Sequence, residues 1–380
     1  MTTPAYASRS TLIRDLYAGS LTPDRLMATL KTADTLFPAA TVARSAVSSK
    51  LPVASRQLQS VEVVRANRRY DLVDYLAYNR IAGLLVLKDG AIVREDYELG
   101  LAPDDRFASF SLAKSVCSTL YGVALQDGLL GSLEAPISRY LPALAHSAYR
   151  EVSLRQVLEM TSGVGWDETY TDPASQRRQF LELQIAGHPD SLLRMMSELP
   201  RVRTPGSVFN YNTGETFLAG AALEAAIGAP LARYLHERVW SPAGMQDDAR
   251  WWLESPDGAA IGGSGLSATL RDYARFARFV LEDGCIGTTR VVREGWFEQA
   301  TTRIAANGER RDYGYQWWLP EVADGVHDGA FLAMGIFGQR IYLHPRRRLA
   351  IIALCARPKP SDAHVVEDSA FFAAVARALD

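Results

Sequence analysis

Ser111-Leu112-Ala113-Lys114 is the segment of this sequence whose residue types and spacing could support covalent catalysis. Residues three apart lie on the same face of a helix, so the serine hydroxyl and the lysine amine can come within hydrogen-bonding distance. Serine is a weak nucleophile without an adjacent base. A lysine amine can be that base when burial lowers its pKa from about 10.4 toward neutrality. The motif alone therefore leaves two interpretations open: a serine nucleophile with a lysine base, and the commoner case of an N-cap serine followed by a solvated lysine.

The elements around this motif would hold it at the start of a helix. Leucine, valine and alanine recur at spacings of three and four from Leu112 to Ala124, and Asp127-Gly128 ends the pattern. Before it, an apolar run from Ile81 and an alternating run from Ala91 are joined by Asp89-Gly90, which predicts a β-hairpin. The first turn of a helix leaves backbone N–H groups unpaired, and these can stabilise a developing oxyanion.

The chain-wide pattern predicts an α/β protein with two lobes. After the hairpin the chain is mostly helical, and strand-like runs return only after Asn307-Gly308. This order predicts an antiparallel sheet formed by the N- and C-terminal parts, flanked by helices, with an inserted helical lobe. We expect an N-terminal arm over residues 1–75, a sheet domain over 76–110 and 255–380, and a helical lobe over 111–254. The active site would lie between the sheet domain and the lobe.

Composition excludes several classes of function. Of 380 residues, 48% are hydrophobic and 22% are charged, which is typical of a folded globular protein. A net charge of -2 gives no electrostatic footprint for nucleic acid. Only five of the 41 lysine and arginine residues are lysines. A lysine three residues after a serine is therefore less often expected by chance in this chain. No phosphate-binding loop, dinucleotide fingerprint or Gly-x-Ser-x-Gly elbow is present.

Metal sites and membrane segments are not expected either. The three cysteines are scattered, and the six histidines show no spacing typical of zinc ligands, so we expect neither metal nor cofactor. No apolar run reaches the roughly 18 residues needed to cross a bilayer. Residues 1–17 contain Arg9, Arg14 and Asp15 and lack the apolar core of a secretory signal. We therefore expect a cytoplasmic protein without membrane contact.

The order of further segments resembles the serine beta-lactamase and penicillin-recognising superfamily. The closest pattern is that of its class C-like branch, which includes family VIII carboxylesterases and 6-aminohexanoate-dimer (nylon oligomer) hydrolases. The likeness runs from about Ile81 to Ala356. It rests on the segments LLVLKDGAIVRE, SFSLAKS, GLLGSLEAPISRYLPAL, VSLRQVLEMTSGVGWDE, PGSVFNYNTGETFLAGAALEAAIG, SPAGM, GGSGLSATLRDYARFARFVLEDG, YGYQWWL and GIFGQRIYLHP.

This resemblance implies a beta-lactamase/transpeptidase-like fold and further site residues. Tyr211 opens Tyr211-Asn212-Thr213 at the place of the family's Tyr-x-Asn motif, which implies a catalytic acid–base role beside Ser111 and Lys114. A phenol held partly as phenolate can take the serine proton and return it to the leaving group. The likeness also implies oxyanion contacts from the backbone N–H groups of Ser111 and Ile336, and substrate binding by Tyr170 and Thr213.

Two departures from the family pattern bear on the substrate. The family's Lys-Thr-Gly strand motif is missing, and its position aligns either with Gly335–Gln339 or with His327–Gly329. Thr213 stands where asparagine is usual. Without the lysine, a substrate carboxylate would lose a charge-assisted contact of roughly 1.5 to 3 kcal/mol. This disfavours beta-lactams and peptidoglycan peptides.

The combined pattern predicts a serine hydrolase that cleaves small carboxylic esters or linear amides, such as 6-aminohexanoate oligomers, through an acyl-enzyme on Ser111. The alternatives are a beta-lactamase or DD-peptidase, an acyltransferase, and a non-catalytic relative. The expected partner is a small-molecule ester or amide, and the resemblance leaves a homodimer open.

Overall fold

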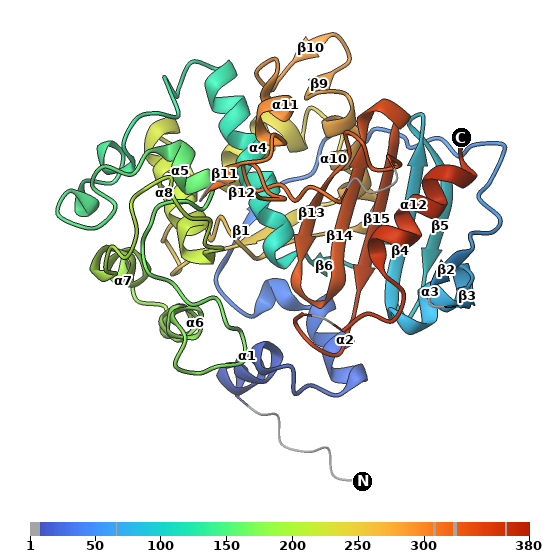
Figure 1. Ribbon diagram of the computed structural model, residues 1–380, viewed down its shortest axis with the longest axis horizontal. Coiled ribbons are helices and arrows are strands. Elements are labelled where there is room, and N and C mark those ends of the chain that lie inside the picture. The colour runs from blue at the N-terminus through green and yellow to red at the C-terminus, as the bar shows by residue number, and fades with distance from the viewer. Residues whose placement is uncertain (1–7, 66, 307–308, 322–324, 362) are drawn as a thin grey trace.

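A central antiparallel sheet combines strands from the two ends of the chain. The structure, a computed structural model, describes residues 8–65, 67–306, 309–321, 325–361 and 363–380. The strand order is β13-β14-β15-β4-β5, and every pair is antiparallel. The strands are β4 (Ile81–Lys88), β5 (Ala91–Tyr97), β13 (Phe331–Gly335), β14 (Gln339–His344) and β15 (Leu349–Cys355). The sheet predicted from the two ends of the chain is therefore confirmed (Figure 1).

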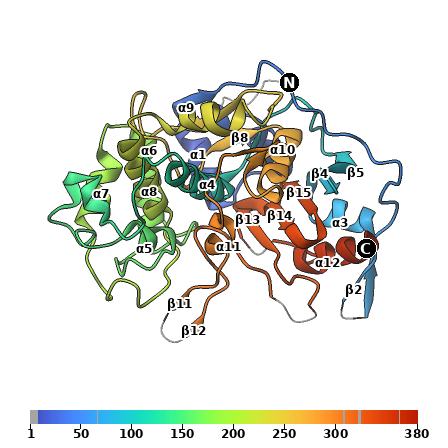
Figure 2. The same ribbon diagram turned by 90° about the horizontal axis from the view of Figure 1, so that it is seen from above.

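Strand β4 shows why its sequence is apolar without interruption. Leu85 and Leu87 face one hydrophobic cluster, while Leu84 and Val86 face the other. Helix α10 (Leu270–Leu281) covers one face of the sheet, and α3 (Leu72–Tyr78) and α12 (Asp368–Ala378) cover the opposite face (Figure 2). Because successive side chains of a strand point to opposite faces, a strand covered on both sides must be apolar throughout.

The predicted hairpin and the predicted helix after it are both present. Asp89 and Gly90 connect β4 to β5 with φ of 53° and 79°, values that suit a tight hairpin turn. Helix α4 (Ala113–Gln126) follows a 3-10 turn at Phe110–Leu112, and every residue from Ala113 to Ala124 is buried. The Ser-x-x-Lys segment therefore lies at the beginning of a helix that runs through the interior.

Helices form the second lobe, beside the sheet (Figure 1). They connect through loops that carry further site residues. These helices are α5 (Leu154–Leu158), α6 (Gln176–Ala186), α7 (Ser191–Glu198), α8 (Thr213–Ile227) and α9 (Leu231–Leu235). Asn212 caps α8 by accepting a hydrogen bond from the Glu215 backbone N–H at 3.1 Å.

A second sheet crosses the boundaries that the sequence predicted. Its order is β1-β7-β8-β6, with β1 (Ala39–Val42), β6 (Phe107–Ala108), β7 (Ala249–Trp252) and β8 (Leu266–Ala268). Residues 1–75 therefore do more than pack on the body as an arm, because β1 pairs with β7. This sheet joins all three predicted divisions.

The remaining elements are short or peripheral. The N-terminal segment contributes α1 (Arg9–Ala18) and α2 (Pro23–Lys31), and α11 (Trp296–Ala300) is a further short helix. Two-stranded pairs are formed by β2 (Val63–Arg65), β3 (Arg68–Tyr70), β9 (Cys285–Ile286), β10 (Thr289–Arg290), β11 (Ala305–Ala306) and β12 (Glu309–Arg310). Among the described residues, no helix combines the length and the apolar character that spanning a membrane would require.

Candidate active site

Ser111 is presented by a constrained turn between β6 and α4. The residue before it, Phe110, has φ of 46°, a left-handed conformation that is unfavourable for a bulky side chain. Phe110 is 1% exposed and packs against Phe337, with ring centroids 5.4 Å apart. The Ser109 backbone N–H donates to the Leu266 carbonyl at 2.8 Å, which fixes the turn to β8. Tertiary packing therefore holds the strained backbone that places Ser111 at the helix start.

Lys114 is buried and directed at the serine. Its Nζ lies 2.9 Å from Ser111 Oγ, 3.1 Å from Thr213 Oγ1 and 2.9 Å from the Gly263 carbonyl oxygen. The side chain is 2% exposed. Burial lowers the pKa of Lys114 to about 7, with a smaller lowering from Arg177 and an opposing increase from Glu168. Near neutral pH the amine can therefore lose its proton and accept one from the serine.

Tyr211 completes the group that the sequence predicted. The Lys114 amine lies 5.1 Å from the centroid of the Tyr211 ring, and the Trp318 ring stacks on the Tyr211 ring with centroids 5.5 Å apart. Burial, and then the charge of Glu168, raise the pKa of Tyr211, while its hydrogen bond with Ser111 lowers it less. This direction differs from the expected partial phenolate. The structure instead gives a neutral phenol, which can donate a proton, beside a lysine that can accept one.

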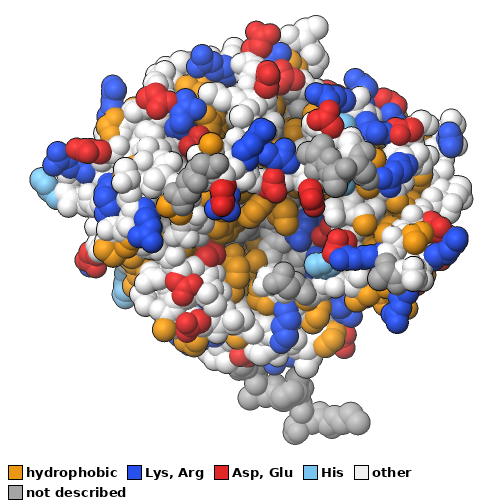
Figure 3. All heavy atoms as spheres, viewed as in Figure 1, with side chains coloured by type: hydrophobic (Ala, Val, Ile, Leu, Met, Phe, Trp, Pro, Cys, Tyr) orange, Lys and Arg blue, Asp and Glu red, His pale blue; other side chains and the backbone are white. Residues whose placement is uncertain are grey.

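A cavity of about 420 Å³ opens over Ser111. Figure 3 shows the molecule hollowed near the middle of this face, with hydrophobic side chains inside the hollow and charged side chains around it. The lining is contributed by the turn before α4, the loop after Trp166, the end of β13 and the segment after β15. The lining residues are Ser111, Glu168, Tyr170, Tyr211, Trp318, Met334, Gly335, Ile336, Gly338, Arg340, Arg357, Lys359, Pro360, Ser361, Ala363 and His364.

The end of β13, and not His327, lies beside the serine. A Cβ placed on Gly335 would lie 2.2 Å from the Ser109 carbonyl oxygen, so these two backbones are in direct contact. Ile336 follows Gly335 and lines the cavity with Ser111. His327 instead contacts the Tyr342 hydroxyl at 3.0 Å and the Ser369 carbonyl at 3.2 Å. Of the two alignments left open by the sequence, the structure places Gly335–Gln339 next to Ser111.

The two predicted substrate-binding residues are placed differently. Tyr170 lines the cavity, and its hydroxyl donates to Glu168 Oε1 at 3.0 Å. Thr213 is 2% exposed and lies behind the cavity, where its hydroxyl is already engaged. It contacts Lys114 on one side and Glu168 on the other. The structure therefore brings Thr213 to the lysine, whereas the sequence assigned it to the substrate.

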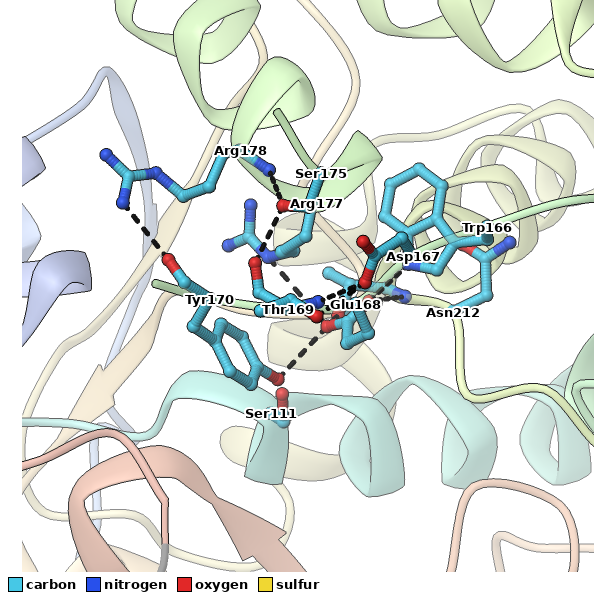
Figure 4. A network of polar contacts seen from close by, with 12 residues as sticks. Ser111, Trp166, Asp167, Glu168, Thr169, Tyr170, Ser175, Arg177, Arg178 and Asn212 are labelled. Carbon is cyan, nitrogen blue, oxygen red and sulfur yellow. Dashed lines mark hydrogen bonds and ion pairs between the residues drawn. The ribbon is translucent and has the colours of Figure 1, made fainter. Parts of the chain in front are cut away.

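Glu168 and Gly263 belong to this group of residues, although no sequence pattern singled them out. Glu168 is 15% exposed and lies in the loop before α6; Figure 4 shows its side chain above the start of α4, where Ser111 lies. Gly263 belongs to the glycine-rich segment Gly262–Gly265, which packs directly on α8: a Cβ on Gly262 would lie 2.6 Å from the Thr216 carbonyl oxygen. Clustered glycines were the available signal, because they often mark close backbone approach.

The described residues contain no group of three or more histidine, cysteine, aspartate or glutamate side chains arranged to hold a metal ion. The polar atoms around Ser111 are those of an amine, hydroxyls, a carboxylate and backbone groups. Together they can activate a hydroxyl and stabilise negative charge on a carbonyl oxygen.

Comparisons with known proteins agree on one family. Residues 74–375 match the family model described as Beta-lactamase. The chain is 30% identical over 335 residues to the 6-aminohexanoate-dimer hydrolase of Paenarthrobacter ureafaciens, covering 83% of each chain. It is 28% identical over 186 residues to Esterase EstB of Burkholderia gladioli, covering 45% of this chain and 43% of the esterase.

Solved structures show the same fold. A Bacillus anthracis protein provisionally assigned as a 6-aminohexanoate-dimer hydrolase superposes with a TM-score of 0.82 at 22% identity, over 99% of this chain and 97% of that one. A family VIII carboxylesterase gives a TM-score of 0.61 at 17% identity, over 99% and 98% of the two chains. These likenesses confirm the predicted fold class.

Proposed function

Because the chain belongs to the beta-lactamase family, we propose that it is a serine hydrolase of the Ser-Lys-Tyr type that cleaves small carboxylic esters or linear amides through an acyl-enzyme on Ser111. The observation that carries this proposal is the buried Lys114 amine 2.9 Å from Ser111 Oγ. The relationship to a 6-aminohexanoate-dimer hydrolase and to an esterase supports the two substrate classes.

In the proposed reaction, Ser111 Oγ attacks the substrate carbonyl carbon while its proton passes to the neutral Lys114 amine. The backbone N–H groups of Ser111 and Ile336 hold the resulting oxyanion. The intermediate then breaks its bond to the leaving alcohol or amine, which takes a proton from the Tyr211 hydroxyl, and Lys114 returns a proton to Tyr211. Water attacks the acyl-enzyme by the reverse path and releases the acid.

Replacement of the nucleophile tests this proposal directly. Ser111→Ala is expected to abolish hydrolysis of a p-nitrophenyl ester, and a fluorophosphonate probe should label Ser111 alone. In the wild-type protein, kcat/KM should rise with pH through about 7, because Lys114 must lose its proton to act as the base and burial lowers its pKa to that value. Undiminished turnover by Ser111→Ala would rule the proposal out.

A substrate carrying a carboxylate is a second candidate, because three cationic side chains line the cavity. Arg340 and Arg357 are both paired with Asp368, whereas Lys359 donates to the Gly19 backbone carbonyl at 2.7 Å. Lys359 comes from the segment after β15 and not from the strand position that the family uses. Turnover of nitrocefin at a rate comparable to that of a neutral p-nitrophenyl ester would favour this candidate. Turnover of the neutral ester without turnover of nitrocefin or of 6-aminohexanoate dimer, which both carry a carboxylate, would exclude it.

A further inference from the structure

Glu168 is an acceptor surrounded by donors on both of its oxygens. Its Oε2 accepts from the Trp166 indole N–H at 2.5 Å and from the Thr213 backbone N–H at 2.9 Å. Its Oε1 accepts from the Tyr170 hydroxyl at 3.0 Å and from the Thr213 hydroxyl. Indole and backbone N–H groups can only donate, so this pocket requires an acceptor on the Oε2 side. A carboxylate satisfies both sides at once.

The position of the Thr213 proton follows from this arrangement. The Thr213 hydroxyl has one hydrogen and contacts both Glu168 Oε1 and Lys114 Nζ. Because a carboxylate only accepts, the hydrogen points to Glu168, and the Thr213 oxygen must accept from Lys114. The carboxylate therefore sets the direction of the hydrogen bond between Thr213 and the lysine.

The lysine lone pair is fixed by the same reasoning. Nζ contacts Thr213 Oγ1, the Gly263 carbonyl oxygen and Ser111 Oγ at 3.1, 2.9 and 2.9 Å. The first two can only accept here, so they take both N–H bonds of a neutral amine. The lone pair is then left facing Ser111, whose hydroxyl donates to it. This is the hydrogen-bond direction that a base for the serine needs.

We propose that Glu168 is a positioning residue that orients the Thr213 hydroxyl and thereby keeps the Lys114 lone pair directed at Ser111. This inference rests on the proposed function. Without the carboxylate, the Thr213 hydroxyl can turn its hydrogen toward Lys114 and compete with Ser111 for the lone pair. Glu168 touches neither reacting atom, so it acts through Thr213.

Glu168→Gln tests the direction of these bonds with almost no change in shape. The N–H groups on the Oε2 side force the glutamine oxygen to that side, so its NH₂ group faces the hydroxyls of Thr213 and Tyr170. The Thr213 hydrogen is then free to turn to Lys114. We expect the plateau kcat/KM for a p-nitrophenyl ester to fall about 10- to 100-fold, the range for losing a charge-assisted hydrogen bond.

The pH profile separates positioning from a merely structural role. The charged and titratable groups that act on Lys114 are Glu168, which raises its pKa, Arg177, which lowers it, and Cys117 within α4; Tyr211 lies across from the amine. In Glu168→Gln, the loss of the carboxylate and the new hydrogen bond donated by Thr213 both favour the neutral Lys114 amine, and so both lower its pKa. The ascending limb of kcat/KM should therefore move to lower pH, by about one unit. A lower plateau with an unmoved limb would overturn the inference.

A double-mutant cycle tests whether Glu168 acts through Thr213. In a Thr213→Val background, which has no hydroxyl to turn, Glu168→Gln should change the plateau kcat/KM by no more than about threefold. An equal loss in both backgrounds would overturn the inference. Thr213→Ser keeps the hydroxyl, so the ascending limb of its kcat/KM profile should lie at the wild-type pH. The ascending limb of Thr213→Val, which lacks the hydroxyl, should move. The Thr213→Ser and Thr213→Val variants test the same hydrogen bonds. Their comparison therefore replaces Glu168→Gln as the test if that variant does not fold.

Glu182→Gln is the matched control. Glu182 lies on α6 and pairs with Arg14 at 2.6 Å. Its replacement by glutamine is the same chemical change as Glu168→Gln, but at a position away from Lys114. Its pH limb should coincide with that of the wild type. Fluorophosphonate labelling of wild-type Ser111 distinguishes the two possible failures. If Ser111 is unlabelled and Ser111→Ala retains turnover, the proposed function fails; if Ser111 passes both tests and the cycle is additive, only the role of Glu168 fails.

Discussion

In the proposed reaction, the neutral phenol of Tyr211 divides the proton transfers between two residues. Its pKa is raised by burial and by Glu168, while burial lowers the pKa of Lys114 to about 7. Lysine is therefore suited to remove the serine proton and tyrosine to supply one. A tyrosine in this role matters most when the departing group cannot leave without a proton.

Tyr211→Phe should therefore discriminate between leaving groups. We expect kcat for a linear amide to fall on the order of 100-fold or more, the contribution typical of a general acid. For a p-nitrophenyl ester, whose leaving group needs no proton, the loss should be at least about tenfold smaller. Parallel measurement of kcat on the two substrates checks this. Equal losses would show that Tyr211 acts mainly in positioning Ser111 or Lys114.

Glu215 is a buried carboxyl near the site whose protonation affects stability. It is 1% exposed and contacts Ser162, with Tyr149 Oη and Asn212 Nδ2 each at 3.4 Å. Burial raises the pKa of Glu215 from 4.5 to about 8. The folded protein therefore binds this proton more tightly than the unfolded chain does. Its contribution to stability is complete below about pH 4.5 and is lost as pH rises toward 8.

Glu215→Gln should remove this pH dependence, because an amide stays uncharged. The wild type should lose stability relative to the variant between pH 5 and 8.5, with each pKa unit worth roughly 1.4 kcal/mol. Urea unfolding of both proteins at the two pH values measures the difference. Glu198→Gln, at an exposed position, is the control and should follow the wild type. If the free energy of unfolding of the wild type and of Glu215→Gln changed in parallel with pH, the prediction would be contradicted.

At the scale of elements, close contact between β13 and the turn before α4 brings together the two proposed oxyanion donors. Gly335 ends β13 and touches the Ser109 carbonyl, two residues before the nucleophile, while Ile336 follows it in the cavity lining. The absence of a side chain at Gly335 lets these two segments approach each other. Their separation sets the distance between the two proposed oxyanion donors.

Gly335→Ala should force the two segments apart. A Cβ there would lie 2.2 Å from the Ser109 carbonyl oxygen. We expect a destabilisation of about 1–3 kcal/mol, typical of overpacking, together with a clear loss of kcat. Gly131→Ala is the control, because a Cβ at Gly131 meets nothing within 4 Å. Thermal melting and ester hydrolysis by the two variants test this, and wild-type behaviour of Gly335→Ala would refute the steric argument.

Local patterns predicted the elements that depend on neighbouring residues. Asp89-Gly90 specified its hairpin through backbone conformation, and the apolar spacing after Leu112 specified α4. The Ser111 and Lys114 pair was predictable for the same reason, since one helical turn sets their separation. The family resemblance added Tyr211, which no local pattern would have singled out.

Contacts between distant segments were not predictable in this way. Pairing of β1 with β7 joins residues about two hundred positions apart, and nothing in either short segment specifies its partner. Gly263 contacts Lys114 and Glu168 contacts Thr213 from separate loops, so their roles depend on how α8 packs against both. The buried environment that keeps Tyr211 neutral is likewise a tertiary property, which is why the expected phenolate was not found.

At the scale of the whole molecule, the N-terminal helix connects the helical lobe to the nucleophile turn. Tyr17 on α1 is 1% exposed, with the Arg177 guanidinium 4.7 Å from its ring centroid and the Phe110 ring 6.3 Å away edge-on. The exposed pair between Arg14 and Glu182 adds a second contact between α1 and α6. Exposed ion pairs contribute little, so Tyr17 should carry most of this connection.

Tyr17→Ala should therefore weaken both stability and catalysis. We expect a loss of about 3 kcal/mol or more, as for other buried aromatic truncations, and a reduced kcat because Phe110 and Arg177 lose a common neighbour. Tyr17→Phe keeps the ring and should lie close to the wild type. Urea unfolding and ester hydrolysis measure both effects. If Tyr17→Ala melts like the wild type, α1 is only loosely attached.

The sheet order also constrains how the protein is made. Strand β4 is produced early, yet its neighbour β15 follows more than two hundred residues later. Until then, an apolar strand with an unpaired edge is exposed on the nascent chain, a condition that favours aggregation. The serine likewise precedes Ile336 by the whole helical lobe. A ribosome-bound chain that ends before β13 would therefore carry the proposed nucleophile and its base but no complete site, so hydrolysis should appear only late in synthesis.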